Sequence, residues 1–185
     1  MSKTVIVTGA SRGIGHAISL YYAKKGFNVC VCCHKNADML DSLKDEIENI
    51  GADCMTYVGN IGIFENAAEF FSLIKERFGK ADILINNAGI SYIGLLQDMT
   101  PSDWNNIITS NLTSVFNCCK LAIPIMLGSH EGKIINISSV WGCVGASTEV
   151  AYSATKGGIN AFTKALAKEL APSNIQVNAD RKSVV

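Results

Sequence analysis

The sequence predicts a doubly wound α/β domain, in which a parallel sheet lies between two layers of helices to make three layers. Short apolar runs rich in β-branched residues alternate along the chain with longer stretches of helical periodicity, as is typical of this fold class. No internal repeat, low-complexity tract or linker interrupts the alternation. A chain of 185 residues is long enough for one domain with a sizeable core, and we expect this domain to span residues 1–179.

The first strand is the run Val5-Ile6-Val7, whose branched side chains suit a strand buried on both faces. The other strands are expected at residues 28–33, 53–58, 82–86, 133–137 and 174–178. Helices are expected at residues 13–25, 37–50, 63–78, 101–127 and 150–170. Pro101 suits the first turn of its helix, and Pro124 is expected to kink or end that helix. Right-handed crossovers then give the strand order 3-2-1-4-5-6.

Charge and composition exclude several classes of protein. Lys plus Arg number 16 and Asp plus Glu number 16, so no basic surplus exists to bind nucleic acid or an anionic membrane. No apolar run approaches the ~20 residues that span a bilayer, and we expect no signal peptide, because Met1 leads almost directly into the first strand. The cysteines, 7 in number, favour reduced, buried thiols in a cytoplasmic protein. Cys30 and Cys33 point to opposite faces of one strand, so we expect no metal site there.

A glycine-rich turn joins the first strand to the first helix. Gly9, Gly13 and Gly15 permit backbone angles and close approaches that other residues forbid. The helix that begins there offers unpaired N–H groups and the positive end of its dipole, which suits a phosphate. Residues 8–15, 86–89 and 138–139 all follow strand ends on one edge of the sheet, next to the point where the winding reverses. We therefore expect a ligand site on this edge.

Tyr152 and Lys156 lie four residues apart on one expected helix and therefore share a face. A nearby ammonium favours the phenolate and is expected to lower the pKa of the tyrosine from about 10 toward neutrality. Such a phenol can exchange a proton with a carbonyl oxygen. Taken by itself, the same spacing also fits a surface lysine beside a partly buried ring.

These residues together resemble the short-chain dehydrogenase/reductase family over nearly the whole chain. Residues 8–15 look like its Thr-Gly-x-x-x-Gly-x-Gly cofactor loop, and residues 86–89 match its Asn-Asn-Ala-Gly motif. Asn111 matches its structural and proton-relay asparagine. Ser139 precedes Tyr152 by thirteen positions, as the catalytic serine of the family does, whereas Ser138 is one place out of register and is expected to be supporting. The resemblance implies a Rossmann fold and a nicotinamide cofactor.

The resemblance also implies roles for individual residues. The catalytic residues would be Asn111, Ser139, Tyr152 and Lys156. Tyr152 is the acid/base, Lys156 holds the nicotinamide ribose and lowers the pKa of Tyr152, Ser139 hydrogen-bonds the substrate carbonyl, and Asn111 holds a water. The residues expected to bind the cofactor are Gly9, Ser11, Arg12, Gly13, Ile14, Gly15, His34, Asn60, Ile61, Asn87, Ala88, Gly89, Tyr152 and Lys156.

The charge of the loop after the second strand favours NADP(H) over NAD(H). A dehydrogenase that prefers NAD usually has an acid at the end of this strand, which binds the ribose 2′-hydroxyl. In this chain Cys33 occupies that position, followed by His34 and Lys35. Arg12 offers a planar donor fork to a 2′-phosphate, although a solvated loop arginine is the alternative. Asn60 stands where the family often has Asp, and its amide still suits the adenine ring.

Three functions remain open for the chain. It is similar to the 3-oxoacyl-[acyl-carrier-protein] reductases in residues 8–15 and 110–116. Residues 137–152, with Trp141 and Glu149, look closer to a sister branch that reduces the 5-aminopentanone group on modified elongation factor P. The third reading is a dinucleotide-binding protein, or a fragment, without turnover. The substrate is therefore a small-molecule or carrier-bound carbonyl compound.

The end of the sequence departs from the family pattern. Residues 180–185 resemble no family continuation and are expected to form an atypical tail, without the Pro-Gly turn, the substrate-covering helices and the last strand. Strand six is then expected to have an exposed edge. The family forms homodimers or homotetramers in its full-length form, and Ala161, Phe162, Ala165 and Leu166 are candidates for such a face, with core packing as the alternative.

Overall fold

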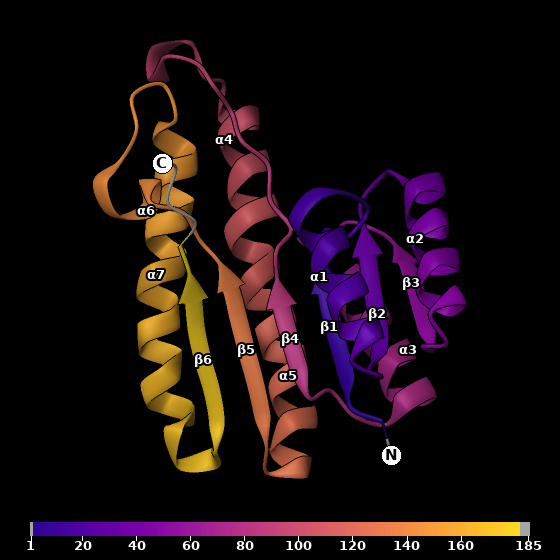
Figure 1. The fold of residues 1–185 in the computed structure, drawn as a ribbon. Coiled ribbons are helices and arrows are strands. Elements are labelled where there is room, and N and C mark those ends of the chain that lie inside the picture. Colours follow the sequence, from indigo (N-terminus) through magenta and orange to yellow (C-terminus); the bar gives the residue numbers. More distant parts are fainter. Residues whose placement is uncertain (1, 182–185) are drawn as a thin grey trace.

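A parallel sheet forms the centre of the molecule in the computed structural model, which describes residues 2–181 (Figure 1). The sheet has 6 strands in the order β3-β2-β1-β4-β5-β6, and every neighbouring pair is parallel. The strands are β1 (Thr4–Thr8), β2 (Asn28–Cys33), β3 (Cys54–Val58), β4 (Ile83–Asn86), β5 (Gly132–Ile137) and β6 (Ile175–Asp180). The predicted fold class and strand order are confirmed.

Helices cover the two faces of the sheet unequally. The α-helices are α1 (Gly13–Lys24), α2 (Ala37–Asn49), α3 (Phe64–Phe78), α4 (Pro101–Ile108), α5 (Ser114–Ser129), α6 (Trp141–Val144) and α7 (Val150–Leu170). One core lies between the sheet and α3, α5 and α7, and a second lies under α1 and α2. In Figure 1, α1 and α2 lie over β1, β2 and β3, and the same face of β5 and β6 carries no helix within residues 2–181. An apolar groove of about 560 Å³ runs between α1 and this bare part of the sheet.

The helix predicted at residues 101–127 differs from the prediction in two ways. Thr100 begins it with a reciprocal capping box to Asp103, and Pro101 occupies the first turn as expected. A π-helical turn, Thr109–Thr113, then separates α4 from α5, and the sequence pattern did not indicate this turn. Pro124 does not end the helix, which continues to Ser129. Buried Ala122 and Met126 flank the proline and hold that turn against the core.

β6 extends further than predicted, to Asp180, because Asp180 pairs with Ile137 of β5. Residue 180 therefore belongs to the domain rather than to the predicted tail, and Arg181 is the last described residue. The rest of that tail, residues 182–185, lies outside the described residues. β6 is the last strand in the sheet order, so its outer edge pairs with no strand of residues 2–181.

The helical stretch Pro101–Ser129 is long and apolar enough to cross a membrane by length and composition alone, contrary to the expectation that no run approaches that length. Its apolar side chains are those of a core helix, since Val115, Cys118, Ala122 and Met126 are buried against the sheet. No membrane protein is therefore indicated by this helix.

The proposed association face of α7 divides into two parts. Leu166 is buried in the core and Phe162 packs against it, whereas Ala161 and Ala165 are exposed. Two of the four candidates thus serve the interior of the domain, which was the stated alternative.

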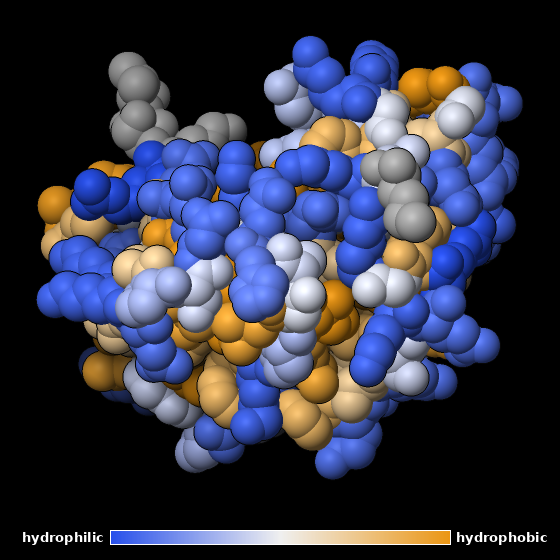
Figure 2. Space-filling model, turned by 90° about the horizontal axis from the view of Figure 1, so that it is seen from below, coloured by the Kyte–Doolittle hydropathy of each residue, from blue (hydrophilic) through white to orange (hydrophobic). Residues whose placement is uncertain are grey.

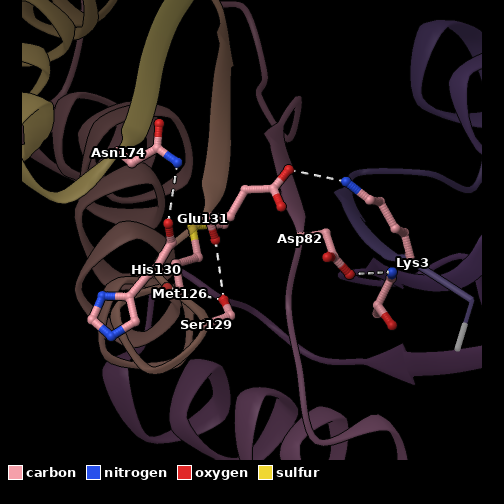
Figure 3. A network of polar contacts seen from close by, with 8 residues as sticks. Lys3, Asp82, Met126, Ser129, His130, Glu131 and Asn174 are labelled. Carbon is pink, nitrogen blue, oxygen red and sulfur yellow. Dashed lines mark hydrogen bonds and ion pairs between the residues drawn. The ribbon is translucent and has the colours of Figure 1, made fainter.

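The amino ends of the strands form a polar surface of loops with apolar residues between them (Figure 2). Asp82 Oδ2 accepts a hydrogen bond from the backbone N–H of Thr4 at 2.6 Å, which ties the start of β1 to β4 (Figure 3). Lys3 Nζ pairs with Glu131 Oε1 at 3.0 Å, and the Asn174 side chain donates to the carbonyl of His130 at 3.2 Å. These contacts link loops that are far apart in sequence.

Candidate active site

Thr8 joins two loops at the carboxyl ends of the strands. Its Oγ1 accepts hydrogen bonds from the backbone N–H groups of Asn87 and Ala88, each at 3.0 Å. The Asn87 amide donates in return to the carbonyls of Thr8 and Gly9, each at 2.9 Å. The loop after β1 and the loop after β4 are therefore held together as one rigid floor.

Two glycines permit this close contact. Gly9 has a φ of 64°, and a Cβ there would lie 2.7 Å from the Cα of Ala88. A Cβ on Gly15 would lie 2.5 Å from the carbonyl oxygen of Gly9. Gly15 is buried below the floor and does not line the cleft above it, so its part in the site is to allow the loops to pack.

A cleft of about 430 Å³ lies above this floor. It brings together most of the residues predicted to bind a cofactor: Gly9, Ser11, Arg12, Gly13, Ile14, His34, Asn60, Ile61, Asn87, Ala88 and Gly89. Cys33, which the sequence placed at this end of β2, also lines the cleft. The sequence reasoning missed the other lining residues, namely Cys32, Asn36, Gly59, Ile90 and Ser110. Asn36 follows His34 closely in the chain and adjacency alone would have found it, whereas Ser110 comes from the distant π-helical turn.

The lining of this cleft is suited to an anionic ligand. Among its lining residues in the described part of the chain there is no Asp or Glu, whereas Arg12 and His34 are both present and exposed. The first turn of α1 begins at the same place and offers its N–H groups. These groups suit the phosphates of an anionic ligand.

A second cleft of about 430 Å³ holds three of the four predicted catalytic side chains. Ser139, Tyr152 and Lys156 line it, together with Trp141 and Glu149. The two clefts share Ile14, Asn87, Gly89 and Ile90, so they form one continuous depression. Lys156 and Tyr152, whose spacing predicted a shared helix face, both lie beside the glycine-loop cleft.

Lys156 is a buried cation with a side chain only 4% exposed. Its Nζ donates to the carbonyl of Ile137 at 2.6 Å and lies 5.5 Å from the centroid of the Tyr152 ring. Burial lowers the pKa of Lys156 from 10.5 to about 8, because the charged form loses hydration. The amine is therefore close to its titration point at physiological pH.

The pKa of Tyr152 is raised, which contradicts the expectation that Lys156 lowers it. Burial of the ring is the main cause, the Ser139 side chain partly offsets it, and the Glu149 carboxylate adds to it. The Lys156 ammonium donates its hydrogen bond to the Ile137 carbonyl.

The two serines after β5 have different partners. Ser139 Oγ accepts a hydrogen bond from the backbone N–H of Trp141 at 3.2 Å and remains at the wall of the second cleft. Ser138 Oγ donates to the backbone carbonyl of Lys156 at 3.2 Å, so it ties β5 to α7. Ser138 also lines the cleft, and its bond agrees with the supporting role predicted for it.

Asn111 lies in the π-helical turn and is fully buried. Its Oδ1 accepts from the N–H of Ile90 at 2.8 Å, and its Nδ2 donates to the Ile90 carbonyl at 2.9 Å and to Thr155 Oγ1 at 3.2 Å. Both amide hydrogens are therefore engaged within the protein. The side chain therefore positions the loop at Ile90. Sequence reasoning missed Thr155 altogether.

Cys30 and Cys33 belong to separate cores on the two faces of the sheet, as their spacing indicated. Within residues 2–181, no group of His, Cys, Asp or Glu is arranged to hold a metal ion.

Comparisons with known proteins agree with this geometry. A family model described as short chain dehydrogenase matches residues 3–181. The chain is 42% identical over 182 residues to the 3-oxoacyl-[acyl-carrier-protein] reductase FabG of Staphylococcus aureus strain Mu50, and the match covers 97% of this chain and 73% of that protein. It is 38% identical over 177 residues to FabG of Thermotoga maritima, covering 96% of this chain and 72% of that protein.

A crystal structure described as a short-chain alcohol dehydrogenase from Sinorhizobium meliloti 1021 matches with a TM-score of 0.93 and 34% identity, over 99% of this chain and 73% of that one. The family uses a nicotinamide dinucleotide to interconvert CH–OH and C=O groups. The chain therefore belongs to the short-chain dehydrogenase family of oxidoreductases.

Proposed function

We propose that the chain is an NADPH-dependent carbonyl reductase that converts a 3-oxoacyl thioester to a 3-hydroxyacyl thioester. The observation that carries this proposal is the continuity of the two clefts, which brings Ser139, Tyr152 and Lys156 beside the glycine-loop cleft. The similarity to 3-oxoacyl-[acyl-carrier-protein] reductases supports the substrate class. The full enzyme would act as a homo-oligomer.

Each residue contributes to one step of the reduction. A reduced nicotinamide, when bound in the first cleft, would supply the hydride for the carbonyl carbon. Tyr152 donates its phenolic proton to the carbonyl oxygen, and its raised pKa means that the phenol is protonated at neutral pH. Ser139 donates a hydrogen bond to the same oxygen as negative charge develops there. Lys156, when charged, opposes the negative charge left on the phenol.

The lining of the first cleft supports NADPH over NADH. Arg12 and His34 provide cationic or donor groups, and no carboxylate of this lining repels a 2′-phosphate. Asn111 acts as a positioning residue, because its amide holds Ile90, which lines both clefts.

Glu149 supports a second candidate, the reduction of a ketone that carries an amine. Its carboxylate lines the second cleft with Trp141 and accepts a hydrogen bond from Ser91 at 2.9 Å. No salt bridge engages Glu149 among the described residues. A fixed negative charge close to Tyr152 would attract an ammonium and repel a carboxylate.

Turnover with two ketone substrates tests these proposals. We expect NADPH consumption with an acetoacetyl thioester, with formation of the 3-hydroxybutyryl thioester in equal amount. Preference for an amino-ketone, abolished by Glu149→Gln, would favour the second candidate. Tight NADPH binding without turnover of either ketone would contradict both and indicate a binding protein.

A further inference from the structure

A buried hydroxyl lies between the two elements that carry the proposed catalytic residues. Thr155 is on α7, between Tyr152 and Lys156, and its side chain is fully buried. Its Oγ1 donates to the backbone carbonyl of Tyr152 at 2.7 Å. The same oxygen accepts from Asn111 Nδ2 at 3.2 Å. The hydroxyl thus connects the turn of α7 that begins at Tyr152 to the π-helical turn.

The direction of these bonds is fixed by chemistry. Thr155 has one hydroxyl hydrogen, which goes to Tyr152, so only its lone pairs are available to Asn111. Asn111 must then present its NH₂ group to Thr155, which leaves Oδ1 for the N–H of Ile90. The hydroxyl therefore favours the same amide orientation of Asn111 that the N–H and carbonyl of Ile90 require.

The orientation of the Asn111 amide determines how the loop at Ile90, which lines both clefts, is held. The Asn111 amide holds both polar backbone groups of Ile90, the residue that follows Gly89. A Cβ on Gly89 would lie 3.3 Å from Asn111 Oδ1 and 3.8 Å from Lys156 Nζ, so this loop passes directly beside the buried amine. Displacement of Asn111 would move the wall that both clefts share.

We propose that Thr155 is a positioning residue for Tyr152: its hydroxyl links the α7 turn to Asn111 and so holds the phenol in register with the loop at Ile90. This inference rests on the proposed reductase function. Thr155 lines neither cleft, so it acts through Asn111 and the backbone of Tyr152 rather than on a ligand.

The same helix supplies a matched control. Thr163 is also buried, its Oγ1 donates to the carbonyl of Ile159 at 2.7 Å, and it accepts from Asn136 Nδ2 at 2.9 Å. Its hydrogen bonds repeat those of Thr155 two turns further along α7, and neither Thr163 nor Asn136 lines the two clefts. Thr163→Val therefore removes an equivalent buried hydroxyl away from the proposed chemistry.

We expect Thr155→Val to lower kcat by about ten- to a hundred-fold, because small displacements of reacting groups have effects of this size. The KM for NADPH should change little, and the pH profile of kcat should shift. Thr155→Ser, which keeps the hydroxyl, should retain most of the activity. Thr163→Val should keep the wild-type kcat and pH profile below its melting temperature. The proposal would be overturned if Thr155→Val and Thr163→Val lowered kcat equally. It would also be overturned if Thr155→Ser lowered kcat as much as Thr155→Val.

A second readout does not depend on turnover. The ultraviolet titration of the Tyr152 phenol is obtained as the difference between each protein and the same protein with Tyr152→Phe. Thr155→Val should shift its midpoint and Thr163→Val should not. If this shift occurs while the wild-type chain reduces no ketone, the proposed function fails and the positioning role stands. An unshifted midpoint in Thr155→Val contradicts the positioning role.

Discussion

Polar side chains at the amino-end edge of the sheet pair with groups near the surface, whereas the carboxyl-end edge carries buried polar side chains, such as Lys156 and Ser139, beside two joined clefts. Lys3 and Glu131 illustrate the first edge, since their side chains are 50% and 55% exposed and pair at 3.0 Å (Figure 3). Lys156 illustrates the second edge, since it is 4% exposed and its Nζ donates to a backbone carbonyl. Both edges fix loops, but only the second keeps a charge away from water.

The difference shows where the molecule accepts a cost in stability. Exposed pairs such as Lys3 and Glu131 contribute little, because water already solvates both charges. Burial lowers the pKa of Lys156 from 10.5 to about 8, which corresponds to about 3 kcal/mol against the charged amine in the folded state. A buried ammonium beside Tyr152 is expected where it serves chemistry rather than folding.

The largest expected effect at the carboxyl-end edge comes from Tyr152→Phe. Removal of the phenolic proton donor should lower turnover by about 10²- to 10⁴-fold, and NADPH should still bind. Steady-state NADPH oxidation and fluorescence titration of NADPH measure the two properties. Tyr21→Phe is the control, because Tyr21 is exposed on α1. A Tyr152→Phe protein with more than about a tenth of wild-type turnover would contradict the assigned role.

Arg12→Gln is expected to change cofactor preference by a smaller factor. Loss of a charged hydrogen bond to a 2′-phosphate should raise the KM for NADPH by about tenfold or more and leave the KM for NADH unchanged. Lys35→Gln is the control, because Lys35 follows His34 but does not line the cleft. Equal effects of Arg12→Gln on both cofactors would argue against contact with the 2′-phosphate.

The smallest effect is expected at the amino-end edge. Lys3→Ala should leave turnover unchanged and lower the melting temperature slightly, with the difference vanishing in about 1 M salt. Pairing lowers the pKa of Glu131 and raises that of Lys3, so the contribution is present at neutral pH. It is lost when acid protonates the carboxylate or alkali neutralises the ammonium. A change in turnover would show that the two edges are coupled.

The elements that the sequence predicted well carry their own local signals. The alternation of strand and helix patterns, with right-handed crossovers, predicted the strand order. The glycines after β1 indicated the edge of the sheet on which the clefts lie. The helix α7 was predicted with its observed bounds, Val150–Leu170. Tyr152 and Lys156 follow from spacing on this one helix, so no long-range contact was needed to bring them together.

The features that were missed depend on contacts between distant segments. The extension of β6 to Asp180 arises from pairing with β5, which no local pattern reveals. The pKa of Tyr152 is set by burial and by Glu149 rather than by the Lys156 four residues away. Thr155 is assigned a role only when Asn111, 44 residues earlier, is seen to bond it.

The most direct test of the contrast between the edges is the free energy of unfolding of Lys156→Met at pH 7, measured by denaturant titration. The account predicts that the variant is about 1–3 kcal/mol more stable than wild type, since the buried charge is removed. The free energy of unfolding of wild type should rise toward that of the variant as pH increases from about 8 to 10.5, because the unfolded chain then binds more protons than the folded one. Lys164→Met, an exposed change on the same helix, should show neither effect. A Lys156→Met protein less stable than wild type at pH 7 would contradict the account.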